Sequence, residues 1–195
     1  VKKVYLYAND NGGYNGIVNC IHFKGNTQKL DTSSDFFNSF LDYSVESWDL
    51  VHNVNLRGSF IINKLGIKLK KTETELSIVN VSSTYGINSP NPSIYGDSGI
   101  NSPISYASSK SAIINLTKYI AVHSKKYNVR ANTLVPGGVY NNQKQSFVKK
   151  YSELTVLGRM AKPTDYIGGF IYLLSDSSSY MTGSSLIIDG GWTAW

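Results

Sequence analysis

Tyr106 and Lys110 lie four positions apart in the segment Ser-Tyr-Ala-Ser-Ser-Lys. On a helix, this spacing puts both side chains on one face, one turn apart. A phenol ordinarily loses its proton near pH ~10, and a neighbouring ammonium lowers that pKa by favouring the phenolate. The pair is therefore suited to moving a proton to or from an alcohol or ketone oxygen. Such a pair can also arise by chance, because the chain has 14 tyrosines. The alternative is an exposed helix pair without function, and the surrounding segments distinguish the two interpretations.

Two short apolar runs rich in β-branched residues predict buried strands before and after that helix. Residues 76–81 are followed by Ser82 and Ser83, and residues 129–135 are followed by Pro136 and Gly137. In open α/β sheets, ligands bind outside the carboxyl ends of the strands. We therefore expect these segments to meet at one site, where strand alternation lets one of the two serines face the ligand.

Two more segments complete an order along the chain. A helical segment that begins at Trp48 carries Asn55. Near the end, Thr182-Gly183 precedes a strand that is followed by Asp189 and two glycines.

This order, from about residue 16 to residue 195, resembles the short-chain dehydrogenase/reductase family in its compact form. The resemblance implies an α/β fold over residues 1–195 as a single domain, with a Rossmann-like, doubly wound parallel sheet and helices on both faces. It implies that Tyr106 is the catalytic acid/base and that Lys110 lowers its pKa and holds the nicotinamide ribose. It also implies that Ser83 bonds the substrate oxygen and that Asn55 holds a water of a proton relay. We choose Ser83 over Ser82 because family members usually use the second serine.

These roles imply an NAD(P)-dependent oxidoreductase that interconverts a hydroxyl and a ketone. Charge builds on the substrate oxygen as hydride moves, so a fixed donor such as Ser83 lowers the barrier. By resemblance, the residues that contact the cofactor are Asn19, Tyr106, Lys110, Pro136, Gly137 and Val139. The choice between NAD and NADP depends on a residue after the second strand of the family, which is not found here.

The beginning of the chain departs from the family pattern. Members open with a glycine-rich turn, Thr-Gly-x-x-x-Gly-x-Gly, which binds the pyrophosphate. Here Gly12, Gly13 and Gly16 lie in a polar segment that is typical of a loop. We expect the chain to match the C-terminal two-thirds of a member, with residues 1–8 as the tail of a helix and residues 17–20 as a bare strand edge.

The interval between Ser83 and Tyr106 is longer than the family usually shows. Its turn-forming, polar and aromatic residues include Tyr95, and hydroxyls there suit a polyhydroxylated ligand. We assign Ser83, Tyr95 and Gln143 to substrate binding. The long loop and the chain ending also resemble reductases of flagellin or surface-glycan modification, which implies a role in glycan biosynthesis with a sugar or sugar nucleotide as substrate.

Composition restricts the partners. The net charge of +6 comes from scattered lysines, so we interpret it as solvated surface and expect no nucleic-acid partner. No apolar run reaches the length of a membrane span, and the three histidines lack metal-ligand spacing, so we expect neither a membrane nor a metal partner. The one cysteine, Cys20, excludes an internal disulfide and fits the cytoplasm, and we expect it to be buried and inert.

Assembly and two other functions complete the expectations. Family members pair through the helices that carry Asn55 and Tyr106, so we expect a homodimer or homotetramer with an apolar outer helix face that includes Ile113 and Ile120. One alternative function is a non-catalytic scaffold, which the missing phosphate turn favours and the complete set of site residues opposes. The other is a sugar-nucleotide epimerase or dehydratase, for which we expect a large C-terminal domain that this chain does not have.

Overall fold

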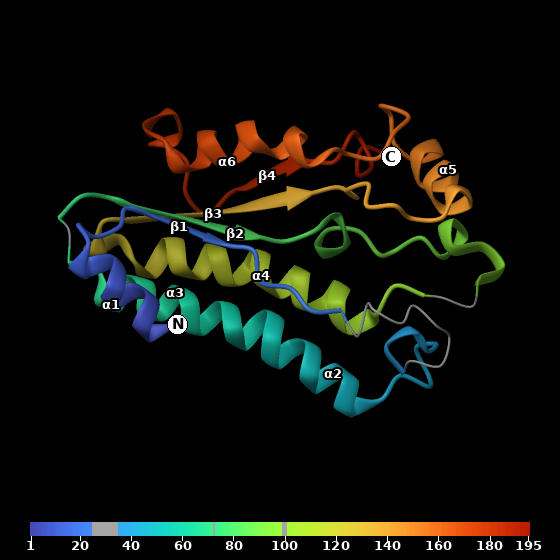
Figure 1. The fold of residues 1–195 in the computed structure, drawn as a ribbon, viewed down its shortest axis with the longest axis horizontal. Coiled ribbons are helices and arrows are strands. Elements are labelled where there is room, and N and C mark those ends of the chain that lie inside the picture. Colours follow the sequence, from blue (N-terminus) through green and yellow to red (C-terminus); the bar gives the residue numbers. More distant parts are fainter. Residues whose placement is uncertain (25–34, 72, 99–100) are drawn as a thin grey trace.

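A parallel sheet of four strands forms the centre of the computed structural model, which describes residues 1–24, 35–71, 73–98 and 101–195. The strands lie side by side in chain order: β1 (Gly16–Asn19), β2 (Leu76–Val81), β3 (Val129–Pro136) and β4 (Ser185–Ile188) (Figure 1). Val79 of β2 lies opposite Val18 and Asn132 of its two neighbours. Because all strands run in the same direction, their carboxyl ends meet at one edge of the sheet.

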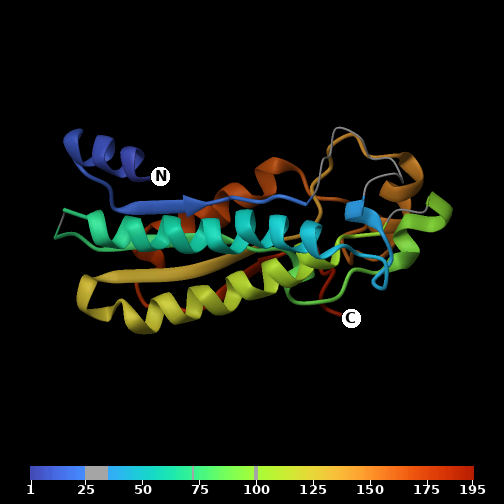
Figure 2. The ribbon, with the colours of Figure 1, turned by 90° about the horizontal axis from the view of Figure 1, so that it is seen from below.

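Helices cover both faces of this sheet, as the Rossmann-like prediction requires (Figure 1). On one face lie α3 (Gly58–Leu69) and α4 (Ile104–His123), with α1 (Lys2–Asp10) packed beside α3. Figure 2 shows α2 (Val45–His52) and α3 running next to α4. The other face is covered by α6 (Ile167–Leu174), and α5 (Gln145–Glu153) follows β3.

Short helical segments connect these elements. A π-helical segment, η2 (Asn53–Arg57), joins α2 to α3 without a break. The other segments are 3-10 helices: η1 (Asp35–Phe37), η3 (Thr84–Gly86), η4 (Pro92–Ser98), η5 (Lys125–Tyr127), η6 (Pro163–Tyr166) and η7 (Asp176–Ser178). Of the predicted loop between Ser83 and Tyr106, residues 99–100 lie outside the described residues.

The apolar core has three clusters, and two of them lie on opposite faces of the sheet because side chains alternate along β2. Ile78 packs in one cluster with Ile17 and Ile120. Its neighbour Val79 packs in the other, with Leu134 and Leu173. Both residues are completely buried, so β2 is a central strand with no solvent-facing side over these positions.

Side-chain amides also cross this core. The Asn80 amide of β2 accepts hydrogen bonds from Asn19 of β1, at 3.0 Å, and from Asn63 of α3, at 2.9 Å. The same amide donates to Thr117 Oγ1 of α4, at 3.1 Å. All four side chains are at least 96% buried. This set of residues, which we call the asparagine network, joins two strands and two helices.

The predicted strands are confirmed, but three predicted exposures are wrong. Cys20 is exposed rather than buried, because β1 alternates and turns Ile17 and Asn19 inward. Ile113 and Ile120 are buried rather than on the outer face of their helix, because this side of α4 packs on the sheet. The predicted homodimer or homotetramer stays a prediction.

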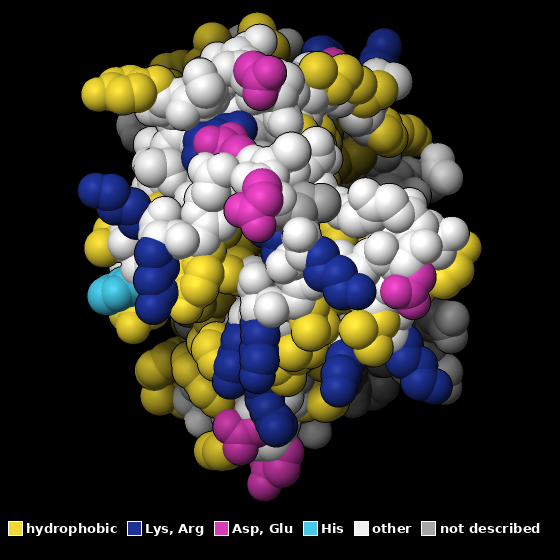
Figure 3. All heavy atoms as spheres, turned by 90° about the vertical axis from the view of Figure 1, so that its left-hand side faces the viewer, with side chains coloured by type: hydrophobic (Ala, Val, Ile, Leu, Met, Phe, Trp, Pro, Cys, Tyr) yellow, Lys and Arg dark blue, Asp and Glu magenta, His cyan; other side chains and the backbone are white. Residues whose placement is uncertain are grey.

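The interpretation of the net charge as solvated surface stays a prediction. Figure 3 shows lysine and arginine side chains spread over one face of the molecule, with acidic side chains between them. Among the described helices, none is both long and apolar enough to cross a bilayer. The residues that the structure describes contain no cluster of three or more histidine, cysteine or acidic side chains that could hold a metal.

Candidate active site

Tyr106 and Lys110 lie one turn apart on α4, as predicted from their spacing. The Lys110 ammonium is 5.9 Å from the centre of the Tyr106 ring. Helix α4 packs on β2 and β3 and also contacts η3, the short segment that follows β2. The helix therefore holds both side chains beside the carboxyl end of β2.

Lys110 is buried to 98% although it carries a charge. Its ammonium donates to the main-chain oxygens of Val81, at 2.8 Å, and Ile21, at 3.3 Å. These bonds use two of its three protons. Desolvation lowers its pKa to about 8, against a smaller opposite effect of Cys20.

Tyr106 has a pKa above its ordinary value in this structure. Burial is the largest cause, a hydrogen bond with the Ser83 side chain acts in the opposite direction, and Tyr95 adds to the rise. The sequence-based expectation of a pKa lowered by Lys110 is therefore wrong for the structure without bound molecules. The phenol is neutral at pH 7 and can act as a proton donor.

The two serines after β2 have different surroundings. The Ser82 hydroxyl donates to the main-chain oxygen of Lys110, at 2.7 Å, and so ties η3 to α4. The Ser83 oxygen accepts a bond from the main-chain N–H of Tyr85, at 3.2 Å, and the Ser83 side chain lies close enough to Tyr106 to lower its pKa. Ser83 is therefore the serine that faces the phenol, in agreement with the choice between them, while its contact with substrate stays a prediction.

Gly86 allows η3 to approach α4 this closely. A Cβ atom at this position would lie 2.6 Å from Ser82 Oγ and 2.8 Å from both the main-chain carbon and oxygen of Lys110. Real Cβ atoms do not approach a main chain so closely, and the backbone cannot yield as a flexible side chain can. The geometry between Ser83 and Tyr106 thus depends on the absence of a side chain at Gly86.

Asn55 is completely buried in η2. Its oxygen accepts from the main-chain N–H of Phe23, and its nitrogen donates to the Phe23 oxygen, at 2.8 Å, and to Ser109 Oγ, at 2.9 Å. The amide thus fastens the segment after β1 to α4. The role of Asn55 in a water relay stays a prediction.

The Asn19 side chain is bonded within the core. Its amide belongs to the asparagine network through Asn80, and its oxygen accepts from the N–H of Ile21, at 3.3 Å. The side chain is 96% buried. It therefore stabilises the turn after β1 and the core, and the contact of Asn19 with a cofactor stays a prediction.

Pro136, Gly137 and Val139 lie in the loop that leaves β3, as predicted. The Gly137 N–H bonds to the Ile188 oxygen of β4, at 2.9 Å, and its oxygen accepts from the Tyr166 hydroxyl, at 3.0 Å. A pocket of about 240 Å³ lies along this loop and includes Gly137 and Gly138 in its lining. The loop is held close to the end of β4, and its contact with a cofactor stays a prediction.

The predicted substrate residues separate in the structure. Tyr95 lies in η4, close enough to Tyr106 to affect its pKa. Gln143 instead braces its own loop: its amide donates to the Val139 oxygen, at 2.9 Å, and accepts from the Asn141 N–H, at 2.7 Å. Both ends of the Gln143 amide are bonded within the loop, and its contact with substrate stays a prediction.

Tyr85 is the residue that the sequence analysis missed. Its hydroxyl lies 3.4 Å from that of Tyr95, and its main-chain N–H holds Ser83. The available signal was its position two residues after Ser83, at the carboxyl end of a predicted strand.

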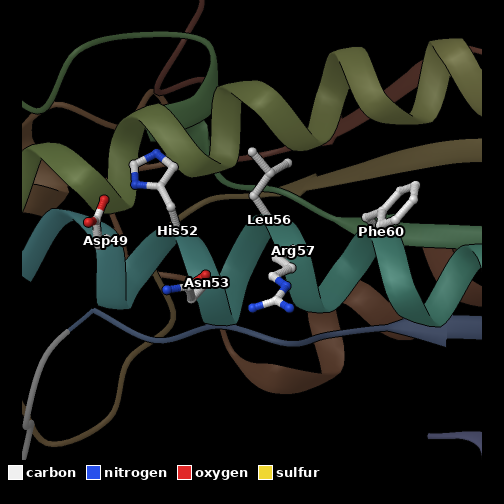
Figure 4. A pocket seen from close by; sticks show the side chains of 6 residues that line it. All are labelled: Asp49, His52, Asn53, Leu56, Arg57 and Phe60. Carbon is white, nitrogen blue, oxygen red and sulfur yellow. The ribbon is translucent and has the colours of Figure 1, made fainter.

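A larger pocket, of about 510 Å³, lies away from these residues. Figure 4 shows that its lining side chains all come from the helical segment formed by α2, η2 and α3. They are Asp49, His52, Asn53, Leu56, Arg57 and Phe60. None of the predicted site residues lines it.

The fold and this geometry define a Rossmann-like protein with a serine, a tyrosine and a lysine at the carboxyl edge of its sheet. The chain belongs to the short-chain dehydrogenase/reductase family. A family model described as enoyl-(acyl carrier protein) reductase matches residues 7–193.

Three similar proteins illustrate the relationship. The post-translational flagellin modification protein A of Campylobacter coli is 31% identical over 140 residues, which cover 72% of this chain and 55% of that protein. The NADH-dependent L-xylulose reductase of Ambrosiozyma monospora is 34% identical over 166 residues, with 79% and 57% covered. A crystal structure of a short-chain dehydrogenase from Leptospira borgpetersenii with bound NAD+ has a TM-score of 0.83 and 35% identity, covering 98% of this chain and 70% of that one. The chain thus spans little more than half the length of these two curated relatives.

Proposed function

We propose that the protein is an NAD(P)-dependent oxidoreductase that interconverts a hydroxyl and a ketone by hydride transfer. The observation that carries the proposal is the placement of Ser83 close enough to Tyr106 to lower its pKa, with Lys110 fixed one turn away on the same helix. Membership of a family with an NAD+-bound structural relative supports the cofactor class. The proposal covers both NAD and NADP.

The residues of this chain would divide the work around a bound nicotinamide cofactor, which supplies or accepts the hydride. Ser83 donates a hydrogen bond to the substrate oxygen, where charge changes during the reaction. Tyr106, neutral at pH 7, gives its proton to that oxygen in the direction of reduction. The buried Lys110 uses two protons on the main chain, and the third suits a ribose hydroxyl.

We further propose a polyhydroxylated, sugar-like ketone or alcohol as the substrate class, and the cytoplasm as the place of action. Tyr95 and Tyr85 bring phenolic hydroxyls within electrostatic range of Tyr106. The similarity to an L-xylulose reductase and to a flagellin modification protein supports this class. The alternatives of a scaffold or of an epimerase gain no specific support from the geometry.

The test is turnover by the full-length natural protein. We expect oxidation of NADH or NADPH in the presence of L-xylulose. The loss of absorbance of the reduced nucleotide measures this oxidation. Tyr106→Phe should abolish nearly all turnover and leave the folding transition in place, because the substitution removes only the transferable proton. Tyr172→Phe, on the solvent side of α6, is the matched control and should retain turnover. Near-normal turnover by Tyr106→Phe would refute the assignment.

A further inference from the structure

Tyr85 and Tyr95 form a pair of phenols that comes from two separate segments. Tyr85 lies in η3 and Tyr95 in η4. Their hydroxyl oxygens are 3.4 Å apart, and both side chains are half-buried. The Tyr95 hydroxyl also bonds with the Ser102 side chain, and its ring contacts Phe147 of α5, with 5.6 Å between the ring centres.

This phenol pair is attached directly to the candidate catalytic groups. The main-chain N–H of Tyr85 donates to the oxygen of Ser83, the side chain that lowers the pKa of Tyr106. Both Tyr85 and Tyr95 interact electrostatically with Tyr106. The two phenols therefore lie within electrostatic range of the hydroxyl that would exchange a proton with the substrate.

The distance within the pair suits the entry of a third hydroxyl. Bonds between two hydroxyl groups are usually 2.7–2.8 Å long, so the bond at 3.4 Å is weak. Burial raises the pKa of both phenols, which keeps them neutral and able to donate as well as accept. An alcohol hydroxyl also donates and accepts, and can exchange this weak bond for two shorter ones.

We propose that Tyr85 and Tyr95 together bind one substrate hydroxyl beside the reacting carbon and so select polyhydroxylated ketones over simple ones. The inference rests on the proposed function. The pair would discriminate because a simple ketone leaves its partly buried hydroxyls without a new partner, whereas a hydroxylated ketone supplies one.

The experiment compares two ketones in the full-length natural protein, with NADH and with NADPH. L-Xylulose carries hydroxyls beside its carbonyl, and cyclopentanone carries none. The readout is the ratio of kcat/KM for L-xylulose to kcat/KM for cyclopentanone. In Tyr85→Phe and in Tyr95→Phe, this ratio should fall about tenfold, as expected for one lost hydrogen bond. Tyr85→Phe keeps the main-chain N–H that holds Ser83, so the change isolates the hydroxyl.

The double variant and the control complete the design. Because both phenols bind one hydroxyl, the double variant should lower the ratio little more than either single variant. The ratio should stay at the wild-type value in Tyr172→Phe. An unchanged ratio in the single variants would overturn the inference. A double variant whose effect on the ratio equals the product of the two single effects would overturn it as well.

The wild-type protein separates this inference from the proposed function. Reduction of cyclopentanone without reduction of L-xylulose would overturn the hydroxyl-binding pair and leave the oxidoreductase assignment in place. Reduction of neither ketone with either nucleotide would contradict the proposed function and the inference together.

Discussion

Replacing the buried Lys110 should change how the stability of the fold depends on pH. The folded chain releases the Lys110 proton near pH 8, whereas the unfolded chain holds it up to about 10.5. Between these values the unfolded state binds more protons, so the free energy of unfolding rises with pH. The penalty for the buried charge is fully present below pH 8 and disappears as the pH approaches 10.5. From about pH 7.5 to about pH 10, this one group should contribute a rise of about 2 kcal/mol.

Lys110→Met removes the charge and keeps most of the side-chain volume, so the contribution should be absent in that variant. Urea unfolding at several pH values gives the difference in the free energy of unfolding between wild type and Lys110→Met. The contributions of the tyrosines, whose pKa values are raised, are the same in both proteins and cancel in this difference. Lys64→Met, on the exposed side of α3, controls for the change in net charge. If the free energies of unfolding of wild type and Lys110→Met change in parallel over this pH range, the lysine is not held in a desolvated site and the reasoning fails.

Two more predictions concern the elements around that lysine. Gly86→Ala should lower the free energy of unfolding by ~1–3 kcal/mol, since its Cβ would overlap the main chain of Lys110; a melting temperature equal to wild type would contradict this packing. Ser83→Ala should lower kcat by about 100-fold through the loss of a donor to the substrate oxygen. Ser82→Ala should lower stability by about 1 kcal/mol and affect kcat far less, so equal kinetic losses in the two serine variants would refute the division of roles.

The strands and the main helices could be predicted because each follows from local chemistry. The apolar run at 76–81 became β2 with the same bounds, and the spacing of Tyr106 and Lys110 required only that their segment be helical. The order of the segments then fixed where the strand ends meet, because parallel strands in one sheet share an edge.

The roles of the amide side chains could not be predicted in this way. Asn19, Asn55 and Gln143 each bond to groups that local sequence patterns do not identify: another strand, the Phe23 backbone and a turn within their own loop. An amide donates and accepts equally well in a core, a loop or a site. The pKa of Tyr106 was misjudged for a related reason, because burial is a property of the whole fold and outweighs a neighbour on the same helix.

The asparagine network has a consequence for how the strands find their register. An apolar strand such as β2 could slide by one residue and still bury valine and isoleucine on both faces. A slide would, however, move the Asn80 amide to the opposite face of the sheet, away from Asn19, Asn63 and Thr117. Several buried polar groups would then lose their partners at once, at a cost of roughly 1–3 kcal/mol each. The network therefore disfavours a shifted register of the strands. In this way it helps to fix the positions of the strand ends that carry Ser83 and hold Lys110.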